Sequence, residues 1–328
     1  MSRWIRQIEK SIASRKLLRE GQDVLLAVSG GLDSMVLLHV LHYLAGAHRW
    51  KLTVAHFNHQ LRGAAGDADE RLVLQTARRL GLRAVAGRAD VAAMARTEGI
   101  SVEMAGRKLR HDFLARTARK LHIPAIALAH HADDQVELFF LRLLRGTGGR
   151  GLAGMQWRNP SPSDRSVELI RPLLDQSKQA LREAAQAAGV RFSEDASNAS
   201  MHIDRNRVRQ ELLPLLRQHY QPRLSERVLS LMELAGAEAQ VVTGLAERWL
   251  GAKRRAKFVR LAIAVQRSVV YLQLSQMGYT PEFELVERLR AKENQPVAVG
   301  SAQWVSRDAS GMVRRRKVKA LKFDGSRL

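Results

Sequence analysis

A glycine turn with a serine at each end lies early in the chain, between an apolar run at residues 24–28 and an apolar helix-like segment. It reads Ser29-Gly30-Gly31-Leu32-Asp33-Ser34. A strand, a glycine turn and a helix N-terminus together aim backbone N–H groups and the helix dipole at one point, which suits a phosphate. The glycines permit close backbone approach, the serines donate from their hydroxyls, and Asp33 can hold a metal ion. The turn therefore predicts an anion-binding loop, with an ordinary strand-to-helix turn as the alternative.

A second set of reactive side chains follows a later apolar run. It reads His130-His131-Ala132-Asp133-Asp134-Gln135-Val136-Glu137. A helix that starts within this segment places Asp134 and Glu137, three residues apart, on one face. Such a pair can coordinate Mg²⁺ that bridges phosphates, or bind the ammonium group of an amine. Alternatively, one of the two neighbouring aspartates only caps the helix, and the histidines are structural.

Two further groups of polar residues are candidates for the same site. His56, Asn58, His59 and Arg62 follow the second apolar run and are candidates to line a nucleotide and nucleobase pocket. The alternative is that Asn58 turns the chain and Arg62 is a cap. In the segment 105–114, Arg107 and Arg110 recur at helical spacing and should share one face, either in a cleft or as a solvated basic surface.

The elements that must position these residues alternate along the chain. Strands are predicted at residues 24–28, 52–57, 83–87, 125–129 and 167–170, and helices at 35–44, 69–80 and 109–121. Such alternation predicts βαβ units and a parallel sheet in an α/β domain, with residues 159–165 as an exposed loop. Because ligands bind at the carboxyl ends of the strands in such sheets, the segments at Ser29, His56 and His130 should face one cleft.

The rest of the chain predicts a smaller, mainly helical domain. Domain limits of 1–216 and 217–328 follow, with helices at 224–250, 258–277 and 282–291, and a β-hairpin from runs at 297–305 and 312–322 around 308–311. Basic runs at 253–257 and 314–319 suit phosphate contacts along an RNA, or form a solvated face.

Composition limits the class of protein. The formal net charge is +22, which suits a polyanionic partner such as nucleic acid. The chain has no cysteine, which excludes disulfides, zinc–thiolate sites and a thiol nucleophile. Residues 1–18 predict an amphipathic first helix, and no stretch approaches the roughly 18 apolar residues of a membrane span, so a cytoplasmic protein with no membrane partner is expected.

The glycine turn resembles the pyrophosphate loop of the N-type ATP pyrophosphatases, the PP-loop superfamily. With the segments at His56 and His130, and with Arg205-Asn206-Arg207-Val208-Arg209 after residues 194–198, the chain resembles the tRNA(Ile)-lysidine synthase family along roughly residues 20–216. The resemblance is to the short form, and the chain departs from the family at Leu138, where a threonine is usual. It implies an adenine nucleotide α-hydrolase-like domain.

The resemblance also implies a reaction and its participants. ATP with Mg²⁺ would adenylate C2 of the wobble cytidine of tRNA(Ile) with the anticodon CAU, and L-lysine would then displace AMP. The implied catalytic residues are Asp33, Arg110, His130, Asp134 and Glu137, with Asp134 as the base. The implied nucleotide-binding residues are Ser29, Gly30, Gly31, Leu32, Asp33, Ser34, His56, Asn58, His59 and Arg62. The implied metal ligands are Asp33, Asp134 and Glu137.

Two alternatives remain at this stage. One is another adenylating tRNA-modifying enzyme of the superfamily, such as a thiolase, although thiolases use cysteines that this chain lacks. The other is a non-catalytic tRNA-binding protein with a relic ATP site. The sequence leaves the oligomeric state open, with a homodimer as one alternative.

Overall fold

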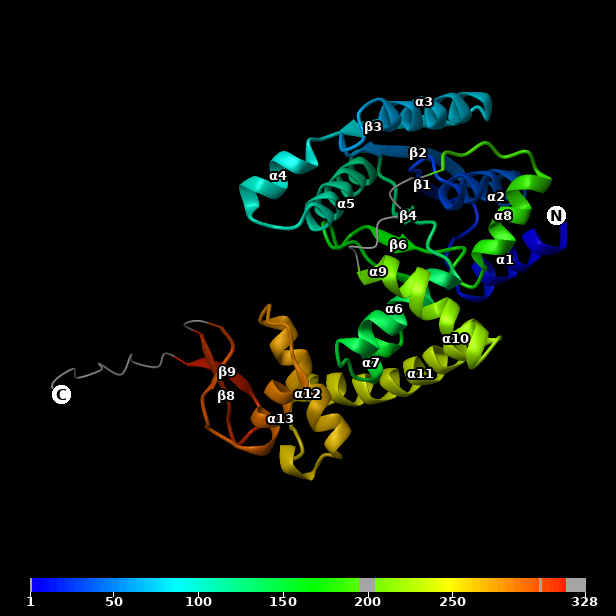
Figure 1. The fold of residues 1–328 in the computed structure, drawn as a ribbon. Coiled ribbons are helices and arrows are strands. Elements are labelled where there is room, and N and C mark those ends of the chain that lie inside the picture. Colours follow the sequence, from blue (N-terminus) through cyan, green and yellow to red (C-terminus); the bar gives the residue numbers. More distant parts are fainter. Residues whose placement is uncertain (1, 195–203, 301–302, 317–328) are drawn as a thin grey trace. The chain divides into compact units, whose positions relative to one another are not determined.

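Six strands form the central sheet of the computed structural model, which describes residues 2–194, 204–300 and 303–316 (Figure 1). The strands are β1 (Asp23–Ala27), β2 (Lys51–Asn58), β3 (Arg83–Arg88), β4 (Ala125–Ala127), β5 (Arg158–Pro160) and β6 (Glu168–Ile170). Their order is β3-β2-β1-β4-β6-β5, and every pair is parallel except β5 with β6. The predicted α/β class and its five parallel strands are confirmed.

Helices cover both faces of this sheet (Figure 1). They are α1 (Ser2–Ser14), α2 (Leu32–His48), α3 (Ala64–Arg79), α4 (Val91–Glu98), α5 (Val102–Lys120), α6 (Ala132–Leu144), α8 (Lys178–Ala187), α9 (Asp204–Arg207) and α10 (Leu213–His219), with the π-helix η2 (Val208–Leu212) between the last two. In β1, Val24 and Leu26 join a core with α1, α2, α3 and α8, whereas Leu25 packs with α5 on the other face. The alternation of side chains along a strand accounts for this two-sided burial.

Two local predictions were wrong. Helix α2 begins at Leu32, not at residue 35, so Asp33 and Ser34 lie in its first turn. Residues 159–165 are not simply an exposed loop: Asn159 and Pro160 pair with β6, and Ser161 is buried. A proline is tolerated here because β5 is the edge strand, where one N–H makes no ladder bond.

The chain divides into two compact units, 1–138 with 155–229, and 139–154 with 230–328. The division at 229/230 differs from the predicted limit at 216/217, because α10 and residues 224–229 stay with the first unit. The second unit also takes up the segment 139–154. The divisions at 138/139 and 229/230 fall within continuous helices, at residues 132–144 and 224–251, and hydrophobic periodicity alone predicts each of these helices as one element.

The second unit is mainly helical and has its own core. It contains α7 (Gly149–Leu152), most of α11 (Leu224–Gly251), the 3₁₀ turn η3 (Phe258–Arg260), α12 (Ile263–Gln276), α13 (Phe283–Ala291), β7 (Val297–Ala298), β8 (Trp304–Arg307) and β9 (Val313–Arg316). The predicted hairpin is present as β8 and β9 in a three-stranded antiparallel sheet, and its predicted residues 301–302 and 317–322 lie outside the described residues. Arg307 is buried and donates to the carbonyl oxygens of Leu289 and Arg290 at the end of α13, where a cation is favourable.

Helix α11 is more apolar than the sequence analysis expected. It contains an 18-residue window of mean hydropathy 1.2, of which 11% is buried. By length and composition alone, the helix could therefore cross a membrane. Core helices of soluble proteins meet the same two criteria, so this is weak evidence for a membrane span.

Candidate active site

A cavity of about 240 Å³ opens at the carboxyl ends of β1, β2 and β4. This is the edge at which the sequence places a cleft. Eight of the predicted site residues line the cavity: Ser29, Gly31, Asp33, Ser34, His59, Arg110, His130 and Asp134. Its remaining wall is apolar, with Phe57, Leu114 and Leu128 among the lining residues. The cavity is thus lined by both polar and apolar residues, which suits a ligand that carries both phosphates and a base.

The glycine turn presents the uncapped N-terminus of α2 to this cavity. Gly31 is the N-cap residue and has no side chain that could bind the first N–H groups of α2. Ser34 turns inward: its Oγ accepts from the Ser29 N–H at 3.1 Å and donates to the Gly31 carbonyl at 3.0 Å. These bonds fix the turn and occupy the Ser29 N–H, so the N–H groups that follow it, at the start of α2, are the ones placed to bind an anion.

The backbone of Gly30 requires glycine. Its φ is +99°, and a Cβ at this position would stand 3.3 Å from the Cβ of Asp69. An L side chain would therefore meet both backbone strain and a close neighbour. Gly30 shapes the turn without lining the cavity.

His131 lies between carboxylates from two elements. Its Nε2 is 3.5 Å from Asp33 Oδ2 and 3.6 Å from Asp134 Oδ2. Burial alone would lower the pKa of this imidazole, but the hydrogen bond to Asp33 and the nearby carboxylate charges outweigh burial and raise the pKa above 6.5. Burial would likewise raise the pKa of Asp33, and the bond to His131 with surrounding positive charges lowers it below 3.8. The imidazole thus links the two acids that the sequence assigned to the site.

Asp134 and Glu137 share one face of α6, as predicted, and both bind arginines from α9 and η2. Arg205 donates from Nη2 to Asp134 Oδ1 at 2.5 Å and from Nε to Glu137 Oε2 at 2.7 Å. Arg209 donates to both oxygens of Glu137, at 2.5 and 2.9 Å. Burial would raise the pKa of Glu137, but these hydrogen bonds outweigh burial and lower the pKa below 4.5. The buried Glu137 is therefore an ionised anchor for two guanidinium groups.

A helical distortion accompanies these arginines. Residues 204–219 run as α9, η2 and α10, and the π-turn lies directly before Pro214, near the start of α10. Proline has no N–H and its ring clashes with the carbonyl four residues earlier, so a wider turn accommodates it. Pro214 therefore accounts for the irregular turn that carries Arg209.

The two aspartates at the start of α6 both bind backbone N–H groups. Asp134 Oδ2 accepts from the His131 N–H at 3.0 Å, and Asp133 Oδ2 accepts from the Lys178 N–H at 2.8 Å at the start of α8. The sequence predicted that one of these two aspartates only caps the helix and that the other is functional. The structure gives the two residues different roles. Asp133 joins α6 to α8, whereas Asp134 lines the cavity. Lys178 also places its Nζ 3.9 Å from Asp33 Oδ2.

Three bases around the cavity have lowered pKa values. Burial, with the charges of Arg110 and His56, lowers the pKa of His59 to about 4. Burial and several arginine charges lower the pKa of His130 to about 3. Arg110 keeps exposed surface at the cavity, yet loss of water around its guanidinium, together with Arg107, lowers its pKa. Both imidazoles are therefore neutral at pH 7, and the positive charge of the wall comes from arginine.

Several predicted residues do not line the cavity. Leu32 is in the core, and buried His56 has its Nδ1 2.9 Å from the Val28 carbonyl oxygen. Asn58 donates to Asp67 and Glu70 and accepts from the Gln60 N–H, which is the turn-forming alternative. The guanidinium of Arg62 is 3.5 Å from an oxygen of Asp69. Glu137 is also absent from the lining.

No site role was predicted for Arg205, Arg209 or Lys178, and His131 was left open between a site role and a structural one. A signal existed for the two arginines, because they recur four residues apart and so share a helical face, as do the acids they bind. No local signal indicated Lys178, since its position beside Asp33 depends on the packing of α8.

The residues around Asp33 fit a divalent cation beside phosphates. Asp33 Oδ1 is buried and accepts no hydrogen bond from the described residues, which leaves a hard oxygen ligand next to the uncapped helix N-terminus. Over residues 2–194, 204–300 and 303–316, no cluster of three or more His, Asp or Glu could hold a metal by itself. A cation bound here would therefore need oxygens from a ligand, as Mg²⁺ does with nucleotides.

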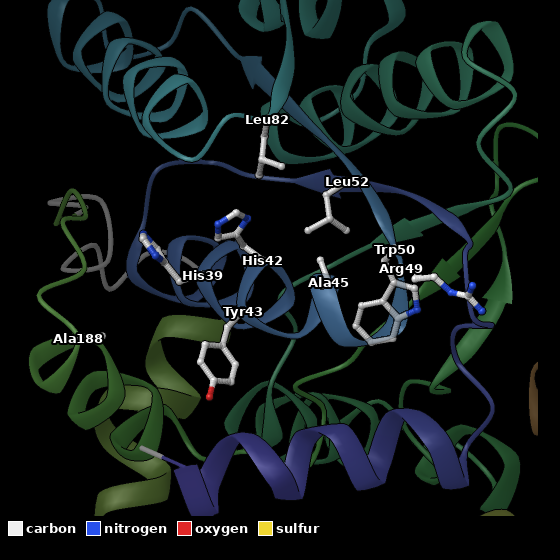
Figure 2. Close-up of a pocket in the computed structure, with 10 residues that line it drawn as sticks. His39, His42, Tyr43, Ala45, Arg49, Trp50, Leu52, Leu82 and Ala188 are labelled. Atoms are coloured by element: carbon white, nitrogen blue, oxygen red, sulfur yellow. The ribbon is translucent and has the colours of Figure 1, made fainter.

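A larger and more open cavity, of about 740 Å³, lies at the opposite edge of the sheet (Figure 2). His39, His42 and Tyr43 from α2 line it, together with Trp50 and Leu52 at the start of β2. It contains none of the predicted site residues. Its size does not make it the better candidate, because the anion-binding loop and the acids lie at the other edge.

Comparisons with known proteins agree with this geometry. A family model described as a PP-loop domain matches residues 2–216. The tRNA(Ile)-lysidine synthase of Geobacter sulfurreducens is 38% identical over 246 residues, which cover 75% of this chain and 51% of that protein. The tRNA(Ile)-lysidine synthase of Petrotoga mobilis is 35% identical over 229 residues, which cover 70% and 71%. The chain thus spans about half the length of several curated relatives that it matches.

One solved structure shows the fold alone. The U34-tRNA thiolase NcsA from Methanococcus maripaludis, with its 4Fe-4S cluster, matches with a TM-score of 0.57 and 16% identity, over 71% of this chain and 77% of that chain.

Proposed function

The chain belongs to the tRNA(Ile)-lysidine synthase family of PP-loop proteins, and from this premise we propose that it is an ATP-dependent carbon–nitrogen ligase acting on tRNA. Its substrates are ATP, L-lysine and tRNA(Ile) with the anticodon CAU, and its products are lysidine at the wobble position, AMP and diphosphate. A cytoplasmic location belongs to the same proposal.

One observation carries this proposal. An uncapped helix N-terminus and two acids, Asp33 and Asp134, border the same cavity, and the buried His131 lies between these acids. The first feature suits the phosphates of a nucleotide, and the second suits a cation and an amine. A protein that only bound RNA would have no need of an ionised, half-buried Asp33 next to a phosphate loop, with a buried Oδ1 that no described residue binds.

In the first step, the C2 carbonyl oxygen of the cytidine attacks the α-phosphorus of ATP. The bond from that phosphorus to the bridging oxygen breaks, and diphosphate leaves with its electron pair. N–H groups of residues 30–34 hold the leaving phosphates, and Arg110 meets the negative charge that grows on the α-phosphate. Asp33 would hold Mg²⁺, which neutralises phosphate charge when bound.

In the second step, the ε-amine of lysine attacks C2, and AMP leaves with the electrons of the C2–oxygen bond. The attacking nitrogen loses one proton, which Asp134 accepts. Asp134 has this role because it lines the cavity. Glu137 does not line the cavity and acts as a positioning residue, since two guanidinium groups occupy both of its oxygens.

Basic residues of the second unit contribute phosphate contacts to the tRNA. In the run 253–257, Lys253, Arg254 and Lys257 are exposed, whereas Arg255 lies over the Trp249 ring. In the run 314–319, Arg314 binds Asp308 and Arg316 donates to Ser306, and residues 317–319 lie outside the described residues. The first run is therefore better placed to bind RNA.

A labelled-lysine assay tests the function. With ATP and the isoleucine tRNA, the wild-type protein should fix labelled lysine in the RNA and release one AMP and one diphosphate per lysine. Asp33→Asn should abolish diphosphate release and leave tRNA affinity nearly intact, whereas Asp23→Asn at the opposite end of β1 should behave as wild type. Binding of the tRNA without any diphosphate release by the wild type would favour the non-catalytic alternative. A thiolase reaction has no support in this chain, which contains no cysteine.

A further inference from the structure

Three arginines and two neutral histidines come to the neighbourhood of the cavity from three elements. Arg107, Arg110 and His111 come from α5, His130 follows β4, and Arg171 directly follows β6. We call these five residues the cationic cluster. Arg110 and His130 line the cavity itself, so the cluster adjoins the site described above.

No carboxylate neutralises this cluster. Within the described ranges, Arg107, Arg110 and Arg171 form no ion pair, and Asp112 is the acid that acts on His111. Burial and the charge of Arg107 lower the pKa of Arg171 to about 10, and burial with three arginine charges lowers the pKa of His111 to about 4. The arginine charges lower the pKa values of their neighbours, so a bound anion would stabilise the cluster.

Arg171 is held in a fixed orientation. It is buried, and its Nη1 donates to the Gln156 carbonyl at 2.7 Å and to Asn159 Oδ1 at 2.6 Å. Its Nε is also buried and has no hydrogen-bond partner among the described residues. Arg171 is therefore a fixed guanidinium whose charge no carboxylate of the described chain offsets, and a nearby anion would be favourable.

We propose that the cationic cluster binds a backbone phosphodiester of the RNA substrate, next to the nucleotide whose base enters the cavity. The proposal rests on the proposed function. The phosphates of ATP have their own loop at residues 29–34, whereas a base that leaves its stack brings a flanking phosphodiester to the rim of its pocket. Arg107 and Arg171 supply the charge for this phosphodiester, next to Arg110 at the α-phosphate, and buried His111 supplies a neutral imidazole among them.

Two substitutions in the cluster test this assignment. Arg107 is exposed, so Arg107→Gln removes charge without opening the core. Arg171→Lys keeps the charge but loses the fixed geometry. Arg116→Gln, on the same helix and outside the cluster, is the matched control. Affinity for the tRNA is measured over a range of salt concentrations, and affinity for ATP is measured separately.

Arg107→Gln should weaken tRNA binding roughly tenfold and lower the salt slope by about 1, and Arg171→Lys should weaken it by a similar factor. ATP affinity should stay unchanged in both variants, and the control should match wild type. If a variant lost as much affinity for ATP as for tRNA, the cluster would belong to the triphosphate of ATP. If Arg107→Gln left tRNA binding unchanged, Arg107 would be part of a solvated face. Either result overturns the proposal. Failure of the wild-type protein to bind tRNA would instead remove the proposed function itself.

Discussion

Glu137→Gln tests whether the buried acid holds the two arginines of the 204–219 helix in place. The side chain of Glu137 is 2% exposed and accepts hydrogen bonds from Arg205 Nε, Arg209 Nε and Arg209 Nη2. The substitution keeps the shape, removes the charge, and turns one of the two oxygens into an amide nitrogen. That nitrogen faces guanidinium donors and cannot accept from them.

The expected loss is roughly 3 kcal/mol of the unfolding free energy of the first unit at pH 7. Removing one partner of a buried ion pair costs about 3–5 kcal/mol, because the other charge stays buried and unpaired. The lower end applies here, since the side chains of Arg205 and Arg209 are 40% and 28% exposed and can regain water. The bonds that the amide oxygen retains, each worth about 1 kcal/mol, are a second reason for the lower end.

The difference between wild type and variant should depend on pH in one direction. The pKa of Glu137 is lowered in the folded protein, so its ionised form contributes stability fully above the unfolded value of about 4.5. That contribution is lost as the pH falls through the lower, folded pKa. The variant has no such group, so the difference should shrink as the pH is reduced below about 4.5.

Hydrogen exchange under urea, followed in peptides from β4 and α6, measures this quantity for the first unit. Glu183→Gln on the exposed face of α8 is the matched control and should change stability by less than about 0.5 kcal/mol. A loss for Glu137→Gln that is below about 1 kcal/mol, or that stays constant down to pH 3, would refute the ion-pair reasoning.

Three further predictions follow from other features of the site and the second unit. Gly30→Ala should destabilise the protein by about 1–3 kcal/mol, because a Cβ would strain a backbone with a φ of +99° and would lie close to Asp69. An unchanged thermal unfolding temperature would contradict this prediction. The His131→Asn variant should lose more stability, relative to wild type, at pH 6 than at pH 9. The pKa of His131 is raised in the folded protein, so its contribution to stability is present below about pH 6.5 and disappears as the pH rises through the pKa of the folded state. Equal losses at both pH values in denaturation experiments would count against this prediction. Replacing Lys253 and Arg254 by Gln should lower the salt slope of tRNA binding by roughly 2 in a titration, and an unchanged slope would place the run outside the interface.

Local sequence was sufficient for the features that depend on neighbouring residues. The apolar run before Ser29, the glycine pair and the apolar helix after it predicted the strand, the turn and the phosphate loop, and the cavity lies there. The spacing of Asp134 and Glu137 predicted a shared face, and Arg205 contacts both. These features are set by backbone geometry over a few residues, which a sequence shows directly.

The tertiary structure decided how these local features are used. Arg205 meets Glu137 across 68 residues of chain, and no spacing rule links two such distant segments. His56 and Asn58 lie at the carboxyl end of β2, where site residues are expected, yet they are buried and contact backbone and side chains of the first unit. Whether a polar side chain faces a cavity or a packed neighbour depends on which helix covers it. That choice is made by long-range packing, and a single sequence contains no direct record of it.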